Sequence, residues 1–435
     1  MKIAMLTNNY KPFVGGVPIS VERQAVGMAK LGHDVTVFAP QYDMEEKEEE
    51  RFCTEDCRGS LRVIRLSTGR CLENGMVIPK LMHRELVSIF QKEGFDLIHT
   101  HHPMIVGPAA LYLGKKFDIP VIYTYHTRYE DYLHYLHPFR PGGMFPKMRK
   151  KFISLGREKI VPGYMRWFTN QCDMVFAPTA GMLKRMRLNG TQVPVVVLPT
   201  GLEDKFYIKH PEKAKEIRQR YISNEEGLLF CTAGRLEAEK NPEFLLQGIW
   251  QLKRKLRQEF KLLFIGDGSM RKELEQKAKQ LDIQDVVCFA GNIPNEELNQ
   301  YLQACDLFLF ASKSETQGIV LAEAMASGCP VVAVRASGVE DIVQDGVNGF
   351  AAEEDAGVWA DKVMEIIHSG KLQEMGRRAK ASAEGFRASG LASYEELLYR
   401  QCIIAKYMEE DIGHAYTTDG KEIAPNVISG IFKAS

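Results

Sequence analysis

Two glutamates stand eight positions apart in a stretch that is otherwise mostly small and apolar, SETQGIVLAEAMASGCPVVA at residues 314–333. Glu315 precedes the apolar run and is predicted to lie in the loop before a helix, and Glu323 is predicted to lie about two turns into that helix. Eight residues of α-helix turn through about 800°, so a continuous helix would place both carboxylates on roughly the same side. An ionised carboxylate only accepts hydrogen bonds, which suits a partner that carries hydroxyl groups. The structural alternative is a capping residue and a buried charge paired to a lysine.

Two cations follow another apolar run, in AGRLEAEKN at residues 233–241. Arg235 offers a planar fork of donors and Lys240 a point charge, and the two bracket a short loop. This combination suits a pyrophosphate. An ordinary charged surface loop is the alternative interpretation.

Three further loops follow apolar runs. Gly15 and Gly16 precede a predicted helix, where paired glycines let backbone N–H groups approach an anion, although a plain tight turn would look the same. His126 ends the run PVIYTYH, and an arginine and two acidic residues follow it closely, which favours a functional site. In AGNIP (290–294), the backbone of Asn292 and Ile293 could pair with the edge of a base.

These residues must be positioned by two series of short apolar runs that alternate with helical patterns. Runs buried on both faces and separated by helices indicate parallel sheets. Polar residues after such strands lie where ligands bind. The predicted strands are 2–7, 34–39, 61–66, 96–101, 120–126, 174–179 and 193–199 in the first series, and 228–234, 261–268, 286–291, 306–312 and 330–334 in the second.

The fold class is therefore α/β, with two Rossmann-like domains facing a cleft. We expect an N-terminal domain over residues 1–203, a second domain over 204–385 and a helical C-terminal segment over 386–435. The polar segment 199–214 is predicted as the linker between the domains. The first loop lacks GxGxxG, which argues against a dehydrogenase.

The composition is that of an ordinary globular protein, with 45% hydrophobic residues and 56 acidic against 56 basic residues. The balanced charge and the lack of aromatic RNA-binding motifs argue against nucleic acid. The nine cysteines are scattered, so a reduced, cytoplasmic setting is expected. No apolar run is long enough to cross a membrane. No DxD triplet follows a strand in an obvious metal position, so no metal or other cofactor is expected.

Two segments depart from this pattern. Residues 44–56 hold seven acids against two bases and are predicted to be a solvated loop or insertion. Residues 140–159 hold seven bases against one acid, interleaved with apolar residues, which is typical of an element on a membrane surface. A solvated helix face is the alternative. The predicted membrane contacts are Lys147, Arg149, Lys150, Lys151 and Phe152.

Taken together, the motifs resemble those of the retaining glycosyltransferases of the large family 4, which have the GT-B architecture. The resemblance covers about residues 1–390 and rests on Gly15-Gly16, His126, Arg235 with Lys240, the AGNIP loop and the Glu315–Glu323 pair. In addition, YHTRYEDYLHY (125–135) is similar to the corresponding segment of bacterial enzymes that glucosylate diacylglycerol.

The resemblance implies an enzyme that moves a sugar, with retention, from a nucleotide sugar such as UDP-glucose to a hydroxyl of a membrane lipid such as diacylglycerol. Glu315 would face the donor sugar and Glu323 the ribose, while His126 would contact the sugar or lie beside the reacting centre. The backbone of Thr316, Gln317 and Gly318 could hold the diphosphate. The resemblance also implies C-terminal helices that cross back to the first domain.

Two other functions remain open. The same chemistry could act on a soluble acceptor, namely a polysaccharide precursor, an inositol phosphate or a sugar phosphate. A sugar-nucleotide-binding module without catalysis is the other alternative. For the lipid enzyme we expect a cytoplasmic protein held peripherally on the inner face of the cell membrane.

Overall fold

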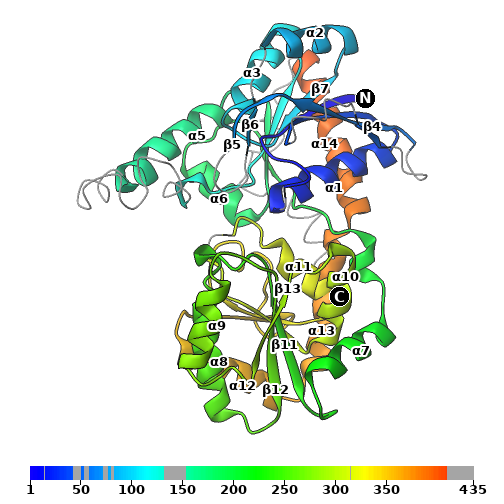
Figure 1. Ribbon diagram of the computed structural model, residues 1–435. Helices are drawn as coiled ribbons and strands as arrows, with labels where there is room; N and C mark the ends of the chain where they lie inside the picture. Colours follow the sequence, from blue (N-terminus) through cyan, green and yellow to red (C-terminus); the bar gives the residue numbers. More distant parts are fainter. Residues whose placement is uncertain are drawn as a thin grey trace. The chain divides into compact units, whose positions relative to one another are not determined.

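A computed structural model describes residues 1–13, 15–42, 50–52, 58–71, 77–79, 83–131, 153–313 and 315–408. The chain forms two compact units (Figure 1). The first comprises Met1–Gly201 and the segment that begins at Ala388, and the second comprises Leu202–Arg387.

The first unit is built on an eight-stranded sheet in the order β10-β9-β8-β7-β1-β2-β4-β3, parallel except for the β3–β4 pair. Because both faces are covered, the central strands are buried at every position and mostly apolar, as predicted. Its strands are β1 (Lys2–Leu6), β2 (Asp34–Pro40), β3 (Glu50–Phe52), β4 (Ser60–Leu66), β7 (Leu97–Thr100), β8 (Val121–Thr124), β9 (Met174–Ala177) and β10 (Val195–Val197). A separate hairpin joins β5 (Thr68–Cys71) to β6 (Val77–Pro79).

Helices of the first unit follow its strands along the chain. They are α1 (Gly16–Lys30), α2 (His83–Glu93), α3 (Val106–Phe117), η1 (Tyr129–Asp131), the π-helical η4 (Gly156–Ile160), α5 (Val161–Thr169), α6 (Ala180–Leu188) and α14 (Ala388–Met408).

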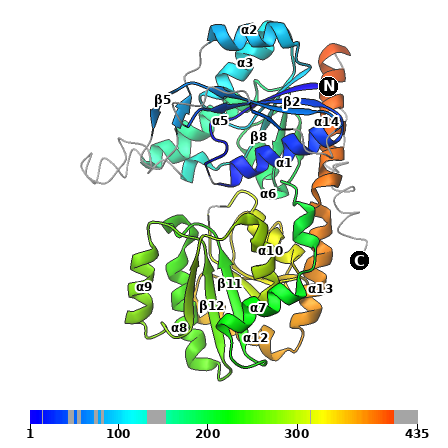
Figure 2. The ribbon, with the colours of Figure 1, turned by 45° about the vertical axis from the view of Figure 1, so that its right-hand side comes forward.

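Helix α14 belongs to the first unit and packs against α1, as the family resemblance implies for the C-terminal helices (Figure 2). A Cβ added at Gly27 would lie 2.9 Å from the Cβ of Ala392, so the two helices pack closely. Leu398, Tyr399 and Cys402 are buried in the core beside β1.

The second unit has a six-stranded, fully parallel sheet in the order β13-β12-β11-β14-β15-β16. Its strands are β11 (Leu228–Ala233), β12 (Phe260–Ile265), β13 (Val287–Gly291), β14 (Leu307–Phe310), β15 (Val331–Val334) and β16 (Gly349–Ala352). The last strand was not predicted, because GFAA is short and follows the turn residues QDGVN.

Helices cover both faces of this sheet, and two apolar cores fill the space between. They are η5 (Asp204–Tyr207), α7 (Pro211–Tyr221), η6 (Ala238–Lys240), α8 (Pro242–Lys255), α9 (Arg271–Gln280), α10 (Asn295–Ala304), α11 (Ile319–Ala326), α12 (Ala356–His368), α13 (Leu372–Ala383) and η7 (Glu384–Phe386).

The prediction of a linker over 199–214 is wrong for much of its length. Leu202, Phe206 and Tyr207 are buried in the core of the second unit, and α7 begins at Pro211. The hydroxyl of Tyr207 donates to the carbonyl oxygen of Ala383 at 2.6 Å. The apolar residues are few among charged ones, so the composition of the segment concealed their burial.

Two of the sequence predictions fall largely on undescribed segments. Within the acidic segment 44–56, residues 50–52 form strand β3 rather than a loop, and the others lie outside the described residues. The predicted membrane contacts Lys147, Arg149, Lys150, Lys151 and Phe152 also lie outside them. Among the helices that the structure describes, none is long and apolar enough to cross a bilayer.

Candidate active site

The loops that carry the predicted donor-site residues meet at one edge of the second unit's sheet. The strands are parallel, and their last residues are in register: Ala233 lies opposite Ile265, and Phe310 opposite Ala333. The loops after β11, β12, β13, β14 and β15 therefore leave from the same edge, which is where ligands bind in such sheets.

The GDG turn after β12 serves chain packing. A Cβ added at Gly266 would lie 2.1 Å from the carbonyl oxygen of Gly234, and one at Gly268 would lie 2.5 Å from that of Leu236. Only glycine lets the two loops lie this close. The turn therefore fixes the loop that begins at Gly234 and carries Arg235.

The two predicted cations each pair with a carboxylate. The Nζ of Lys240 donates to Oε1 of Glu315 at 2.5 Å, and Nη2 of Arg235 donates to Oε1 of Glu239 at 2.9 Å. The Arg235 side chain is 55% exposed, whereas that of Lys240 is 27% exposed. The structure thus brings Lys240 and Glu315 together from loops that are 75 positions apart.

The environment of Glu315 favours its charged form. Burial by itself raises the pKa of the carboxyl. The charge and the hydrogen bond of Lys240, with smaller contributions from Ser312 and Arg235, lower the pKa by more than burial raises it. The net pKa lies below its usual value, so Glu315 is ionised near pH 7.

Glu315 lies in the loop before the helix, as predicted, but the helix begins later than expected, so Glu323 is nearer to its start than the two turns predicted. Helix α11 begins at Ile319, after Gly318, whose φ of +69° breaks the helical path. Glu315 therefore lies in the preceding loop, and Glu323 lies little more than one turn into the helix. The polar residues before Gly318 and the apolar residues after it were compatible with a helix that begins closer to Glu315.

Glu323, Gln317 and the intervening residues form a nearly buried segment. Glu323 is 5% exposed and Gln317 is 6% exposed. Residues 321–326 of α11 are all buried. Thr316, Gln317 and Gly318 occupy the turn before the helix, where backbone N–H groups and the helix dipole favour an anion.

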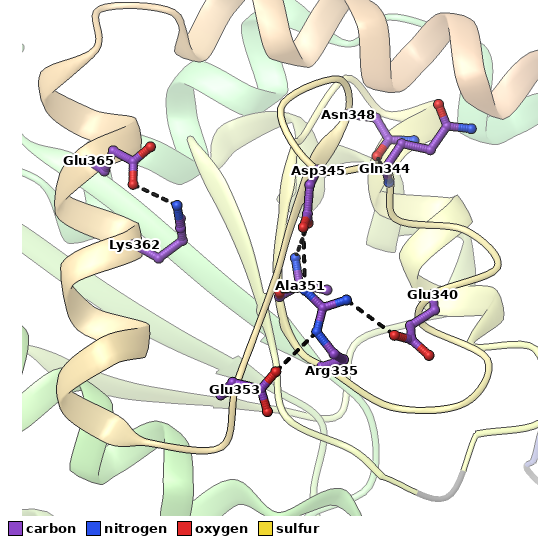
Figure 3. Close-up of polar contacts among 9 residues, drawn as sticks. All are labelled: Arg335, Glu340, Gln344, Asp345, Asn348, Ala351, Glu353, Lys362 and Glu365. Carbon is purple, nitrogen blue, oxygen red and sulfur yellow. Dashed lines mark hydrogen bonds and ion pairs between the residues drawn. The ribbon is translucent and has the colours of Figure 1, made fainter.

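The loop after β15 packs against the backbone of Glu315. A Cβ added at Gly338, whose φ is +82°, would lie 2.8 Å from the carbonyl oxygen of Glu315. Arg335 holds this loop in place through three carboxylates and one carbonyl (Figure 3). The partners are Glu340 at 3.1 Å, Asp345 at 3.4 Å, Glu353 at 3.3 Å and the carbonyl oxygen of Ala351 at 2.7 Å. No sequence motif pointed to this role for Arg335.

Asn292 and Ile293 follow β13 at the same edge. Asn292 is exposed, whereas the Ile293 side chain packs partly against the apolar core. The preceding Gly291 accepts a hydrogen bond from the N–H of Gly266 at 2.8 Å, which ties this loop to the GDG turn. Because the Ile293 side chain faces the core, any ligand contact there involves its backbone.

In the first unit, Gly15, Gly16 and His126 also follow the carboxyl ends of parallel strands. Helix α1 begins at Gly16 with Gly15 as its N-cap residue. His126 follows β8, the second strand along from β1. The acidic and basic residues near His126 have structural partners, because Arg185 donates to Glu130 at 2.7 Å and Arg128 lies 3.9 Å from the same carboxylate.

A cluster of histidines beside His126 was not predicted. Nδ1 of His101 lies 2.9 Å from Nε2 of His126, and the two rings are stacked. The ring of His99 lies 4.2 Å from that of His101 between centroids, and His102 accepts from the N–H of Asn8. The available signal was the sequence HTHH at the end of a strand at residues 99–102, where histidines are rare in an apolar run.

Burial keeps these imidazoles neutral. It lowers the pKa of His99 and of His102 to about 3, and it lowers the pKa of His101 and His126 well below the usual value. In the parts of the chain that the structure describes, no group of three or more His, Cys, Asp or Glu side chains is arranged to hold a metal ion.

Two family descriptions match the two units. Residues 14–206 match "Glycosyltransferase Family 4", and residues 213–382 match "Glycosyl transferases group 1". The chain therefore belongs to the GT-B glycosyltransferases, with a family 4 half followed by a group 1 half.

Two similar relatives share one name. The chain is 29% identical to the alpha-monoglucosyldiacylglycerol synthase of Streptococcus pneumoniae over 80% of this chain and 74% of that protein. It is 26% identical to the enzyme of that name from Acholeplasma laidlawii, over 93% of this chain and 98% of that protein. Another relative, the D-inositol 3-phosphate glycosyltransferase of Xylanimonas cellulosilytica, is 26% identical over 91% and 94% of the two chains.

The fold has solved counterparts. Sucrose-phosphate synthase from Thermosynechococcus elongatus superimposes with a TM-score of 0.73 over 93% of this chain and 99% of that chain, at 21% identity. This similarity confirms the predicted GT-B fold.

Proposed function

We propose that this glycosyltransferase moves glucose from UDP-glucose to a hydroxyl of a membrane lipid such as diacylglycerol, with retention at the anomeric carbon. One observation carries the donor half of the proposal. Lys240, paired with Glu315, lies at the same sheet edge as Arg235, and Glu323 follows in α11. The names of the two relatives above support glucose and diacylglycerol.

The second unit would bind the donor. Glu323 is nearly buried and accepts hydrogen bonds from the ribose hydroxyls, while the turn at Thr316, Gln317 and Gly318 holds the diphosphate with its N–H groups. Glu315 faces the sugar. Arg235 and Lys240 exchange part of their contact with carboxylates for contact with the phosphate oxygens.

In the transfer, the bond between the anomeric carbon and the phosphate oxygen breaks, and a bond to the acceptor oxygen forms on the same face. The acceptor proton passes to the departing phosphate. Arg235, Lys240 and the start of α11 stabilise the negative charge that develops on the leaving group. In this proposal the two cations stabilise the leaving group as a bound metal ion would, so the reaction needs no metal ion. His126, with a neutral ring, hydrogen-bonds a substrate hydroxyl.

The first unit supports a lipid acceptor through an exposed apolar and basic surface on η4 and α5. Ile160 is 60% exposed and Trp167 is 50% exposed, and Arg157, Lys159 and Arg166 are exposed among them. Large apolar side chains with basic neighbours suit the interface of an anionic bilayer. The protein would therefore act peripherally on the cytoplasmic face of the cell membrane.

A soluble acceptor such as an inositol phosphate is the second candidate, supported by the name of the relative from Xylanimonas cellulosilytica. In that case the same donor site would act without a membrane. The two candidates differ in whether the rate responds to lipid.

Nucleotide release from a panel of UDP- and GDP-sugars, with and without diacylglycerol in anionic vesicles, tests the proposal. We expect release from UDP-glucose that rises sharply with diacylglycerol and is lost in Lys240→Ala. A rate that ignores lipid and rises with inositol phosphate would replace the lipid acceptor. If no donor releases its nucleotide, the alternative of a sugar-nucleotide-binding module without catalysis is favoured.

Pelleting with anionic vesicles tests the membrane surface separately. Replacing Ile160 and Trp167 by serine, or Lys147, Arg149, Lys150 and Lys151 by serine, should reduce the pelleted fraction. Val358→Ser, at an exposed position of α12 in the second unit, is the matched control. If both multiple variants pellet like the unchanged protein, the membrane contact lies elsewhere or does not exist.

A further inference from the structure

The side chain of His101 makes a single hydrogen bond among the described residues, and its partner is His126. Nδ1 of His101 lies 2.9 Å from Nε2 of His126. His101 is completely buried, and its other ring nitrogen, Nε2, has no hydrogen-bond partner in the described part of the chain. The arrangement limits where the ring protons can be.

Each neutral imidazole carries one proton, on one of its two nitrogens. One proton must lie between Nδ1 of His101 and Nε2 of His126 for the bond to form. If His126 supplied it, the proton of His101 would sit on Nε2, as a buried N–H without an acceptor. Orphaned buried donors of this kind are rare because their lost hydration is not replaced, whereas an unmatched acceptor is tolerated better.

We propose that His101 is a positioning residue that donates its Nδ1–H to Nε2 of His126 and thereby fixes the proton of His126 on Nδ1. With this tautomer, any hydrogen bond that His126 makes through Nδ1, including one to a substrate oxygen, is a bond that it donates. Since Nε2 is already engaged, the ring has no nitrogen left to accept a proton and does not act as a general base. This inference rests on the proposed substrate contact of His126.

Neighbouring residues hold His101 in this orientation. The His99 ring packs against it, and His99 is itself fixed on both sides. Its Nδ1 lies 2.6 Å from the hydroxyl of Tyr399, and its Nε2 lies 2.6 Å from the hydroxyl of Thr124. Tyr399 donates to Glu395 at 2.6 Å, so α14 anchors the whole cluster.

Two substitutions separate positioning from simple packing. Asparagine places its amide N–H near the position of the imidazole Nδ1, whereas glutamine places its amide near Nε2. His101→Asn should therefore keep kcat within about threefold, while His101→Gln should lower kcat roughly 10- to 100-fold, with a smaller change in KM. Both variants should have similar Tm values. Equal activity of the two, or a more active glutamine variant, would overturn the proposal.

A second measurement does not depend on activity. Nitrogen-15 NMR of protein labelled at histidine distinguishes the two neutral tautomers, and the resonances that vanish in His126→Ala belong to His126. We expect His126 with its proton on Nδ1 in the unchanged protein. A proton on Nε2 would overturn the inference. If His126→Ala kept full activity while the tautomer agreed, the substrate contact would fail and the tautomer assignment would stand.

Discussion

The ammonium of Lys240 lies 2.5 Å from the carboxylate of Glu315 in the partly buried loops at the edge of the second sheet. Each side chain neutralises the other where a donor diphosphate and sugar are proposed to bind. The pair keeps Lys240 extended toward the site before the donor arrives, so little side-chain entropy remains to be lost on binding.

Removing Lys240 should impair turnover. Lys240→Met should lower kcat more than tenfold, because the leaving phosphate loses a cation as its charge develops. Lys240→Arg should restore part of the rate, since the charge is retained. Steady-state kinetics with UDP-glucose measure the effect, and Lys362→Met on α12, which removes a partly exposed ion pair with Glu365, is the control. A normal rate in Lys240→Met would refute the role.

The same variant should change the pH dependence. Lys240 lowers the pKa of Glu315 against the effect of burial, so without Lys240 the burial effect prevails and the pKa rises. The acid limb of kcat/KM in Lys240→Met should therefore lie at higher pH than in the unchanged protein. Profiles between pH 4 and pH 9 test this, and coincident acid limbs would contradict the assignment of Glu315 as the titrating group.

Glu323 should matter for nucleotide affinity. Glu323→Ala should weaken UDP binding roughly 10- to 150-fold, because hydrogen bonds to a charged group typically contribute about 1.5–3 kcal/mol. Glu323→Gln preserves the volume at this nearly buried position. Its affinity for UDP should lie between that of Glu323→Ala and that of the unchanged protein. Calorimetric titration with UDP gives the constants. Unchanged affinity in a folded Glu323→Ala variant would exclude the ribose contact.

Arg335 should affect donor binding from a distance. Arg335→Ala frees the loop that packs against the carbonyl of Glu315, so the KM for the donor should rise severalfold and Tm should fall by a few degrees. Each exposed ion pair alone contributes little, so the loss reflects the shared loss of four contacts. Lys362→Ala, which removes a partly exposed cation on α12, serves as the control (Figure 3). Equal KM values for both variants would show that the loop keeps its place without Arg335.

Glu395 should make stability depend on pH. Burial raises its pKa to about 8 from the usual 4.5, although the hydrogen bond from Tyr399 acts in the opposite direction. Between these values the folded protein holds a proton that the unfolded chain releases. The free energy of unfolding therefore falls as pH rises, by up to about 1.4 kcal/mol per pH unit.

Glu395→Gln removes this titration while keeping an acceptor for Tyr399. Its Tm should fall less between pH 5 and pH 8 than that of the unchanged protein, as thermal unfolding at three pH values would measure. Glu365→Gln, at an exposed position of α12, should retain the original dependence. Parallel Tm curves for Glu395→Gln and the unchanged protein would contradict the raised pKa.

The sequence alone determined most strands of the two largely parallel sheets and the residues that are proposed for the donor site. Strands that are buried on both faces must be apolar throughout, so runs such as Leu228–Ala233 are visible without a structure. Residues after such strands, among them Arg235 and Lys240, necessarily emerge at one edge, because the carboxyl ends of parallel strands lie together.

Only the tertiary structure decided the partners and the exact path of the loops. Gly318 has a positive φ, so the helical conformation begins only after it, at the start of α11. The pattern of apolar residues does not reveal this boundary. His99 meets Tyr399 across 300 positions, and Lys240 meets Glu315 across 75. Such contacts arise from how the loops and α14 pack on the sheets. The local pattern of apolar residues predicts that a residue is buried, but it does not predict which distant residue that residue contacts.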